Sequence, residues 1–302
     1  MRIHLLRLLG LGVVLLASSA QAVIINSGTG GGNTNAPPDD PGWANIGRIL
    51  MAGRGPSSVT YLGSNWFLTA YHVWQLDNPT GVFVNAGTYA VETSSWQRLS
   101  YAGTNADLAM FRVTTAVSGL PTLTLRATVV TNGSPVTMLG DGYDRQPNLT
   151  YWNSAWQVTN STDGVYSGYY WAASAGTKRW GENTSDWSGW VDDGYGVTYM
   201  FRTTFNAGAG ANEAQGATYD SGGGVFFKHD STWELAGTLL AIDEYPGQPF
   251  SSAVFGNTTY MADLAPYRNQ MLAIMAIPEP TGIVLAGLAA LLVVRAIRRW
   301  RT

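Results

Sequence analysis

Three polar residues stand in apolar segments where, together, they could transfer an acyl group. His72 lies in NWFLTAYHV, Asp107 in NADLAMFRV and Ser221 in YDSGGGVFF. Acyl transfer by a serine needs a hydroxyl nucleophile, an imidazole that takes its proton and a carboxylate that orients the imidazole. Backbone N–H groups must also stabilise the negative oxygen that forms. The chain offers one candidate for each of these roles.

Each residue alone also has a purely structural interpretation. His72 is predicted to end an apolar strand and could be an ordinary buried histidine, although it is the only histidine in the apolar part of the body. Asp107 could cap a turn before a strand, but a buried carboxylate needs a hydrogen-bonded partner, and an imidazole is one. The three glycines after Ser221 could simply form a β-turn, or they could let a substrate carbonyl approach the main chain.

In the order His, Asp, Ser, the three segments closely resemble the signature segments of the chymotrypsin/trypsin family of serine proteases. The resemblance continues in VTMLGDG, WELAGTLL and TTYMADLAPYRNQML, so that it covers residues 43–275. Only the aromatic region between Asp144 and Gln215 matches poorly. The resemblance implies an all-β fold with two six-stranded antiparallel β-barrels, a C-terminal helix and an active site in the cleft between the barrels.

The resemblance also implies roles for individual residues by their positions in the motifs. His72 would be the general base and then the general acid, Asp107 the carboxylate that orients it, and Ser221 the nucleophile that becomes acylated. The backbone N–H groups of Tyr219 and Ser221 would form the oxyanion hole. Gln215 would lie near the base of the specificity pocket.

The chain departs from the family pattern at three positions. Tyr219 stands where the family usually has glycine, so its side chain could change the backbone angle that points the N–H at the oxyanion. Leu240 stands where many members have a serine that hydrogen-bonds the triad carboxylate, so we expect Asp107 to have fewer donors. Gln215 is neutral where cleavage after Lys or Arg needs an acid, so the sequence does not predict that specificity.

The composition independently favours a β-rich protein. Of 302 residues, 36 are glycine, and aromatic and charged residues each make up 12%, a mix that suits short strands joined by many turns. Strand-like segments bounded by turn residues are SSVTYLG, NWFLTAYHV, AMFRVTT, SPVTMLG, GVFFK and WELAGTLLAI. One helix is predicted at the end of the body, over residues 262–275, where apolar residues recur at helical spacing.

Metal ions, cofactors and nucleic acid are not expected. The chain has no cysteine, which excludes Cys-based zinc sites, iron–sulfur clusters and thiolate catalysis. Its three histidines are His4, His72 and His229, too few for a multi-histidine metal site once His4 is removed with the N-terminus. Residues 23–276 contain 11 basic and 19 acidic residues, and this net charge of −8 argues against nucleic acid as a partner.

The N-terminus has the layout of a secretory signal peptide. Two arginines precede the apolar run LLGLGVVLLA, and the small-residue pattern Ala20-Gln21-Ala22 follows it. Cleavage after Ala22 would remove residues 1–22. The alternative is an uncleaved anchor helix, which the short apolar run disfavours.

Residues 23–42 are rich in Gly, Ser, Asn, Pro and Asp and are predicted to be a flexible leader. The protease-like domain then spans residues 43–276. Cleavage after Ala22 would make Val23 the new N-terminus. In many members of the family a newly cut apolar N-terminus pairs with the aspartate before the nucleophile, here Asp220. We expect other groups to satisfy that carboxylate.

The C-terminus, residues 277–302, resembles the PEP-CTERM sorting signal of certain Gram-negative bacteria. The sequence PEP is followed by TGIVLAGLAALLVV and by a cluster of four arginines. The arginines should stay cytoplasmic by the positive-inside rule, which places the rest of the chain outside the inner membrane. The resemblance implies a transmembrane helix, recognition by an exosortase-type membrane enzyme, removal of the tail and delivery to the cell surface or extracellular matrix. A plain C-terminal anchor is the alternative.

Residues 143–205 are dense in tryptophan and tyrosine. Such residues could form a stacking platform for sugars or peptide side chains, but we favour packing within a β-rich region as their role. The members include Trp152, Trp156, Tyr169, Tyr170, Trp171, Trp180, Trp187 and Trp190.

The sequence therefore predicts an exported serine endopeptidase that hydrolyses protein or peptide substrates through His72, Asp107 and Ser221. The alternative is a catalytically inactive relative that uses the two barrels as a surface or matrix binding module. That alternative is motivated by Tyr219, Leu240 and the aromatic region. An esterase of the α/β-hydrolase type lacks support, because no G-x-S-x-G motif surrounds Ser221 and the order of the triad differs.

Overall fold

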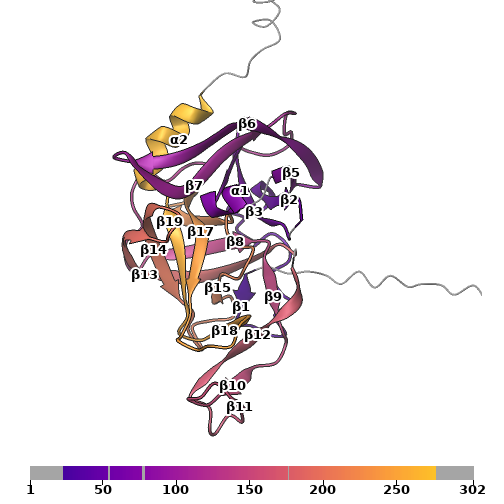
Figure 1. Cartoon of the computed structure of the whole chain (residues 1–302), viewed down its shortest axis with the longest axis vertical. Coiled ribbons are helices and arrows are strands. Elements are labelled where there is room, and N and C mark those ends of the chain that lie inside the picture. Colours follow the sequence, from indigo (N-terminus) through magenta and orange to yellow (C-terminus); the bar gives the residue numbers. More distant parts are fainter. Residues whose placement is uncertain (1–22, 54, 77–78, 176, 277–302) are drawn as a thin grey trace, which may run out of the picture.

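Two closed six-stranded antiparallel β-barrels form the body of the molecule and stand one above the other in Figure 1. The computed structural model describes residues 23–276, apart from residues 54, 77–78 and 176. Closure pairs the strands of each barrel on both sides, which leaves no free sheet edge. The predicted all-β fold with two six-stranded barrels and a short C-terminal helix is confirmed.

The first barrel has the strand order β2-β3-β4-β7-β6-β5. Its strands are β2 (Ile46–Met51), β3 (Ser57–Gly63), β4 (Trp66–Thr69), β5 (Pro79–Val84), β6 (Gly87–Tyr101) and β7 (Thr104–Val113). Phe67 of β4 and Phe111 of β7 are directly paired, both are fully buried, and their ring centroids lie 5.8 Å apart. Such cross-strand pairs hold the register, because a slip of one residue would turn the apolar side chains outward.

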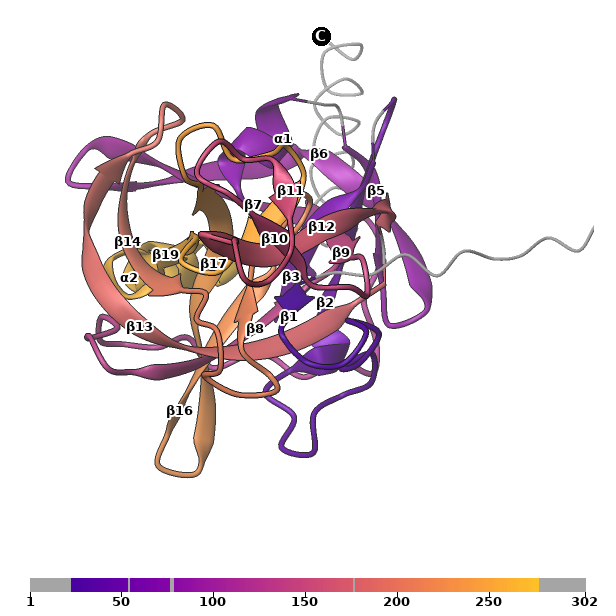
Figure 2. The same cartoon turned by 90° about the horizontal axis from the view of Figure 1, so that it is seen from below.

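The second barrel has the strand order β13-β14-β19-β17-β16-β8, and Figure 2 shows this ring of strands from below. Its strands are β8 (Pro135–Gly140), β13 (Arg179–Asp192), β14 (Val197–Thr204), β16 (Gly224–His229), β17 (Thr232–Asp243) and β19 (Thr258–Asp263). Its interior is filled by apolar side chains that are at most 2% exposed, among them Met138, Phe201, Val225, Leu239 and Met261.

Much of the aromatic region forms a third sheet, whose strands lie between β8 and β13 in the chain except for β18, which follows β17. Its strands are β9 (Tyr143–Arg145), β10 (Thr150–Trp152), β11 (Val158–Thr159), β12 (Tyr166–Ala175) and β18 (Ser252–Val254). Trp152 is fully buried and Tyr169 and Trp171 are at most 7% exposed, so these side chains serve packing, as we favoured. Trp190 of β13 differs from them, because 47% of its surface is exposed.

The helical elements are short. They are η1 (Trp43–Asn45), α1 (Tyr71–Leu76), η2 (Ala265–Tyr267) and α2 (Arg268–Met275). The helix predicted over residues 262–275 begins later than expected. Ala262 and Asp263 are the last residues of β19, where strand pairing outweighs local helix preference. Pro266 lies in the 3₁₀ turn that precedes α2.

Helix α2 joins the two halves of the molecule. It follows the last strand of the second barrel, yet its residues Met271 and Ile274 are buried in the same apolar cluster as the side chains of the first barrel. The side chain of Gln270 accepts a hydrogen bond from the backbone N–H of Ser100 in β6 at 3.0 Å. The helix therefore fixes how the barrels sit against each other.

The predicted flexible leader begins with a buried strand. Val23 is fully buried, and β1 (Ile24–Ile25) pairs antiparallel with β15 (Ala214–Gln215). Burial of each of these apolar side chains contributes roughly 1.5–3 kcal/mol, which outweighs the flexibility that the Gly- and Pro-rich composition suggested.

The predicted signal peptide, residues 1–22, and the predicted sorting signal with its transmembrane helix, residues 277–302, lie outside the described residues. Within the described part of the chain, no helix combines the length and the apolar character needed to cross a membrane.

Candidate active site

His72 is held by the start of a helix, whereas the sequence predicted the end of a strand. Strand β4 ends at Thr69, and His72 lies in the first turn of α1. Because β4 pairs with β7, Asp107 of β7 lies beside this turn. The backbone N–H of His72 donates to Asp107 Oδ1 at 2.7 Å, and the ring Nδ1 of His72 lies 2.6 Å from Asp107 Oδ2. One carboxylate thus fixes both the backbone and the ring of the histidine.

The His72–Asp107 pair is shielded on its carboxylate side and open on its imidazole side. The side chain of Asp107 is 1% exposed, and that of His72 is 18% exposed. The backbone N–H of Asp107 donates to Oγ1 of Thr198 at 2.8 Å, which ties this strand to β14 of the other barrel. The buried carboxylate is satisfied by its partners, and the accessible part of the imidazole is left for a reactant.

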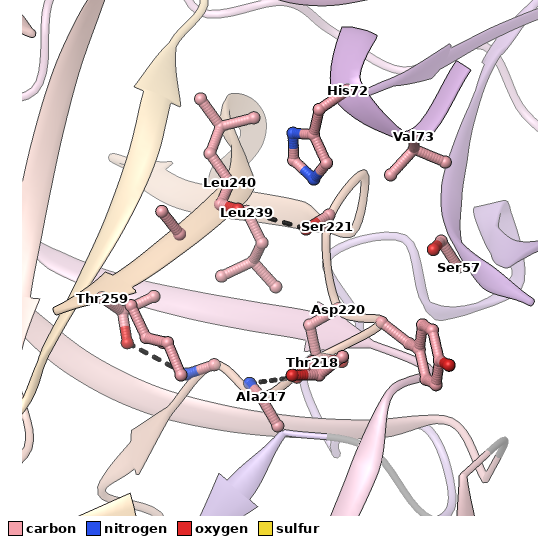
Figure 3. Close-up of a pocket in the computed structure, with 14 residues that line it drawn as sticks. Ser57, His72, Val73, Ala217, Thr218, Asp220, Ser221, Leu239, Leu240 and Thr259 are labelled. Atoms are coloured by element: carbon pink, nitrogen blue, oxygen red, sulfur yellow. Dashed lines mark hydrogen bonds between the residues drawn. The ribbon is translucent and has the colours of Figure 1, made fainter. Parts of the chain in front are cut away.

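Ser221 faces His72 across a shared cavity. It lies in the loop between β15 and β16, and both residues line a cavity of about 210 Å³. Figure 3 shows the ring of His72 directed toward Ser221. The hydroxyl of Ser221 donates to the carbonyl of Leu240 at 3.1 Å, and among the described residues it makes no hydrogen bond to His72. The structure brings the two residues together, with the serine hydroxyl turned toward the second barrel.

Gly222 allows the serine loop to approach the first barrel. Its φ is +93°, which L side chains rarely adopt. A Cβ atom there would lie 2.2 Å from the carbonyl oxygen of Ser58 and 2.3 Å from Oγ1 of Thr69. The hydroxyl of Thr60 also donates to the Gly222 carbonyl at 3.0 Å. Glycine is required here because the loop that carries Ser221 packs directly on β3 and β4.

The backbone of the expected oxyanion hole keeps a glycine-like angle despite its side chain. Tyr219 has φ +75°, a left-handed conformation that costs a residue other than glycine roughly 1–2 kcal/mol. Its carbonyl accepts hydrogen bonds from the N–H and the hydroxyl of Ser58 at 2.9 and 3.1 Å, and its ring stacks on Tyr143 at 5.2 Å. These contacts hold the strained angle. Within the described chain, the N–H groups of Tyr219 and Ser221 have no acceptor.

Asp220, the residue before Ser221, lies in a socket of N–H groups. Asp220 is 1% exposed, and its Oδ2 accepts from the N–H of Ala217 at 2.8 Å and from that of Val23 at 3.2 Å. Its Oδ1 accepts from Gly142 at 2.8 Å. Burial raises the pKa of Asp220 to about 7, although the three N–H groups act to lower it. The expectation that groups other than Val23 satisfy Asp220 is wrong in part, since Val23 is one of three donors.

The walls of the cavity beside Ser221 are mostly apolar. They include Gly216, Ala217, Leu239, Ala241, Ile242 and Thr259. Gln215, expected near the base of the specificity pocket, does not line it. Gln215 is fully buried, pairs with Ile24 of β1 and donates from Nε2 to the Gly216 carbonyl at 3.3 Å. Local sequence could not reveal this, because the partner strand comes from the far N-terminus.

Charged side chains join the two barrels behind the cavity. Arg48 of β2 forms an ion pair with Asp141 at 3.0 Å, and burial raises the pKa of Asp141 to about 6. Nζ of Lys178 donates to the carbonyls of Trp43 and Ile46 at 2.6 and 2.8 Å, and burial lowers its pKa to about 8. These bonds hold the first barrel against the second at the level of the serine loop.

The structure also brings to the site two residues that the sequence did not indicate. Tyr195, in the hairpin between β13 and β14, has its ring 5.1 Å from that of His72. Burial and, second, the negative charge of Asp107 raise the pKa of Asp193 in the same hairpin to about 6. The only sequence signal was the turn motif DDGYG, which predicts a tight hairpin and does not predict where its tip would lie.

The comparisons with known proteins support the fold. No family model matches the chain, and no curated protein matches it. Human heparin binding protein is a similar solved structure, with 14% identity, 82% of this chain and 98% of that chain covered, and a TM-score of 0.50. A variant of the same human protein has 15% identity, 83% and 98% coverage, and a TM-score of 0.50.

A further similar structure is the active form of the Rv3671c protease from M. tuberculosis. It is 13% identical to this chain, and the match covers 78% of this chain and 82% of that chain, with a TM-score of 0.46. The chain thus has the two-barrel fold of the trypsin-like serine proteases, as the human structures show.

Proposed function

We propose that this protein is a serine endopeptidase. The observation that carries the proposal is the His72–Asp107 pair, with its 2.6 Å contact, facing Ser221 across one cavity in the cleft between two barrels. A buried carboxylate, an oriented imidazole and a hydroxyl in this arrangement suit acyl transfer. The two unpaired N–H groups beside Ser221 suit stabilisation of an oxyanion.

In the proposed reaction, the Ser221 hydroxyl turns from the Leu240 carbonyl toward His72. The imidazole takes the hydroxyl proton as the serine oxygen bonds to the scissile carbonyl carbon. The carbonyl oxygen becomes an oxyanion that accepts hydrogen bonds from Tyr219 and Ser221. The C–N bond then breaks, the imidazolium gives its proton to the leaving amine, and water later releases the acyl group by the same steps.

The cavity walls favour a small or medium apolar side chain before the cleaved bond. Ile242 and Leu239 narrow the cavity, and Thr259 presents a hydroxyl that already accepts a bond from Gly216 N–H at 2.9 Å. The charge of Asp220 is engaged by its own socket and offers no partner to a lysine or arginine. A substrate cation would therefore be desolvated without compensation.

We also propose that the N-terminus created by cleavage after Ala22 takes part in the site. A free ammonium group at Val23 would place a positive charge 3.2 Å from Oδ2 of the buried Asp220. The guanidinium of Arg145 holds the following segment by donating to the carbonyls of Ile25 and Ser27 at 2.7 and 2.9 Å. Charge-assisted bonds of this kind are stronger than neutral ones, so processing would stabilise the Tyr219–Ser221 loop.

Export through the inner membrane and sorting by an exosortase-type enzyme complete the proposal. The signal-like N-terminus and the PEP-CTERM-like tail support it. The check is N-terminal and C-terminal mass mapping of the protein from a Gram-negative host that carries such an enzyme. We expect a chain that starts at Val23, lacks the arginine-rich tail and fractionates outside the cytoplasm. A cytoplasmic chain that still starts at Met1 would overturn it.

The alternative function is an inactive binding module of the cell surface or matrix. One observation favours it, namely that the Ser221 hydroxyl is bonded to Leu240 and not to His72. If the protein binds a surface partner and Ser221→Ala leaves every measured property unchanged, this alternative replaces the protease.

The direct test of the protease is covalent labelling. We expect the purified full chain to react with a fluorophosphonate probe at Ser221, as located by mass spectrometry of the labelled peptide. Ser221→Ala should abolish labelling, and His72→Ala should lower it by about 10⁴-fold or more. Ser231, an exposed serine in the turn after β16, provides the matched control through Ser231→Ala. A folded, soluble protein without label at Ser221 would sink the proposal.

A further inference from the structure

The hairpin between β13 and β14 reaches from the second barrel to the catalytic pair of the first. Its tip, residues 193–196, is a tight turn in which the Asp193 N–H donates to the Gly196 carbonyl at 3.3 Å. The ring of Tyr195 packs against the His72 imidazole with 5.1 Å between centroids and 38° between planes. A side chain from one barrel therefore covers the general base of the other.

The tip of the hairpin lies directly against the backbone of β7, the strand that carries Asp107. A Cβ atom on Gly196 would lie 2.4 Å from the carbonyl oxygen of Asn105 and 3.0 Å from Nη2 of Arg98. Two residues later, Oγ1 of Thr198 accepts the N–H of Asp107 at 2.8 Å. The hairpin is thus seated directly on the strand that carries the triad carboxylate.

Arg98 of β6 links the hairpin to both members of the pair. Its Nε donates to the carbonyl of Ala106, the residue before Asp107, at 2.9 Å. Its Nη2 donates to the carbonyl of Tyr195. The guanidinium carbon lies 3.6 Å from the ring centroid of Tyr71, the residue before His72. A movement of the hairpin would therefore shift the residues next to both His72 and Asp107.

Asp193 begins the turn that packs against the strand of Asp107. Its Oδ1 accepts from the N–H groups of Tyr195 and Gly196 at 2.9 and 3.0 Å, which orients the side chain toward the interior of the turn. Burial and, second, the negative charge of Asp107 raise the pKa of Asp193 to about 6. Two neighbouring carboxyl groups hold one proton between them more readily than two negative charges.

This arrangement gives Asp107 a donor in place of the serine that many family members have at the position of Leu240. Leu240 has no side-chain donor for Asp107, and among the described residues the hydrogen bonds that the carboxylate accepts come from His72. A protonated Asp193 has an O–H that can donate to it. The second barrel thus supplies through its hairpin what Leu240 cannot supply.

We propose that Asp193 and Tyr195 are positioning residues for the His72–Asp107 pair, an inference that rests on the proposed protease function. Tyr195 restricts the imidazole to the orientation in which it faces Ser221. Asp193 controls how much negative charge lies on the Asp107 side of the imidazole. Below about pH 6 Asp193 holds a proton and donates to Asp107, and above that pH it adds a negative charge that favours the protonated imidazole.

The titratable groups that interact with Asp193 come from two elements. They are Asp107 of β7 and the hydroxyl of Tyr267 in η2, whose pKa is raised to about 12 chiefly by burial, with a smaller contribution from Asp193. The guanidinium of Arg98, which contacts the same hairpin, donates to backbone carbonyls. The charge of Asp193 therefore acts chiefly on Asp107, the partner of His72.

The test is an NMR titration in a full-length Ser221→Ala background, which needs no catalytic activity. Carbon-13 labelling of the aspartate side chains gives the signals to be followed, and Asp193→Asn assigns that of Asp193. We expect the Asp193 carboxyl group to titrate near pH 6, and Asp107→Asn to lower this midpoint, because a nearby negative charge is lost. Asp192→Asn removes the same charge from an exposed neighbour in the same hairpin and should move it by much less.

Further readouts keep the inference testable if Asp193→Asn does not fold. In the active protein, Tyr195→Ala should lower kcat about 10-fold with little change in KM, and Tyr195→Phe should restore it. Equal shifts of the Asp193 midpoint in Asp192→Asn and Asp107→Asn, or a Tyr195→Ala protein with unchanged kcat, would overturn the inference. If the NMR shifts occur but the wild-type protein does not react with the fluorophosphonate probe, the protease proposal alone is overturned.

Discussion

The two barrels contribute to the site in different ways. The first barrel supplies His72 and Asp107 as a finished unit, joined by two contacts of 2.6 and 2.7 Å. Asp107 lies on β7, and His72 lies on the helix that follows β4, the strand paired with β7. The second barrel supplies Ser221 on a loop that contains a strained Tyr219 and a buried Asp220 and depends on the N-terminal strand.

The difference indicates which parts of the site would decide the proposed activity. The base and the acid are preformed, because strand pairing that stabilises the barrel also brings them together. The nucleophile is adjustable, because its hydroxyl is bonded to Leu240 and its loop is held by groups from several distant segments. We therefore expect changes on the first-barrel side to act on chemistry alone, and changes on the second-barrel side to act on loop geometry.

The largest effect is expected from Asp107→Asn. The pair would lose the charge that stabilises the imidazolium, so kcat on a peptide substrate should fall by about 10⁴-fold at neutral pH with folding preserved. Combined with Ser221→Ala, the change should add almost nothing, because the residues act as one unit. A loss in the double variant equal to the product of the single losses would show that the barrels act separately.

The next effect concerns the N-terminus. A chain that retains Ala22 before Val23 should have a kcat about 10- to 100-fold below that of a chain starting at Val23, because the buried Asp220 then lacks a positive partner. The measurement is peptide hydrolysis by two preparations that differ by this one residue. In an Asp220→Asn background the two should become equal, and a persistent difference would point to another cause.

The same pair of chains should differ in pH dependence of stability. In the chain that retains Ala22, the pKa of Asp220 is raised to about 7 from an ordinary value near 3.8, so the folded state binds its proton more tightly than the unfolded state. Stability from this group should therefore fall as pH rises from about 4 to about 7. A free ammonium at Val23 should reduce that fall. Thermal unfolding between pH 4 and pH 7 checks the sign.

A smaller effect is expected in the cavity wall. Ile242→Gly should raise kcat/KM for substrates with a large aromatic residue before the cleaved bond by about 10-fold relative to those with alanine, since it opens the wall near Ser221. Substrates with lysine or arginine should stay poor. A variant that prefers lysine would show that the apolar walls do not set the specificity.

The smallest effect is expected at Tyr219. Tyr219→Gly should change kcat by less than about threefold, because glycine adopts φ +75° without strain while the loop keeps its other bonds. Tyr219→Val should have a lower kcat than both the wild type and the glycine variant. A branched side chain tolerates this angle poorly and would turn the oxyanion N–H away. Equal activity of the Gly and Val variants would show that this N–H takes no part.

The sequence indicated the fold and the triad because both rest on local patterns. Apolar segments of strand length bounded by turn residues predicted an all-β fold. The resemblance of the short segments around His72, Asp107 and Ser221 to the chymotrypsin/trypsin family predicted the two barrels and the triad. The local setting of His72 was predicted wrongly, because strand and helix preferences are hard to separate over the few residues between Thr69 and the first turn of α1.

The tertiary structure alone decided how the site is completed. Gln215 is sealed behind β1, Val23 reaches Asp220, and the Tyr195 hairpin covers His72, all through contacts between segments more than 100 residues apart in the chain. The residue types and their order therefore determine which chemistry is available. The packing of the second barrel determines whether the nucleophile is in place to use it, because loop geometry depends on distant partners that no local pattern encodes.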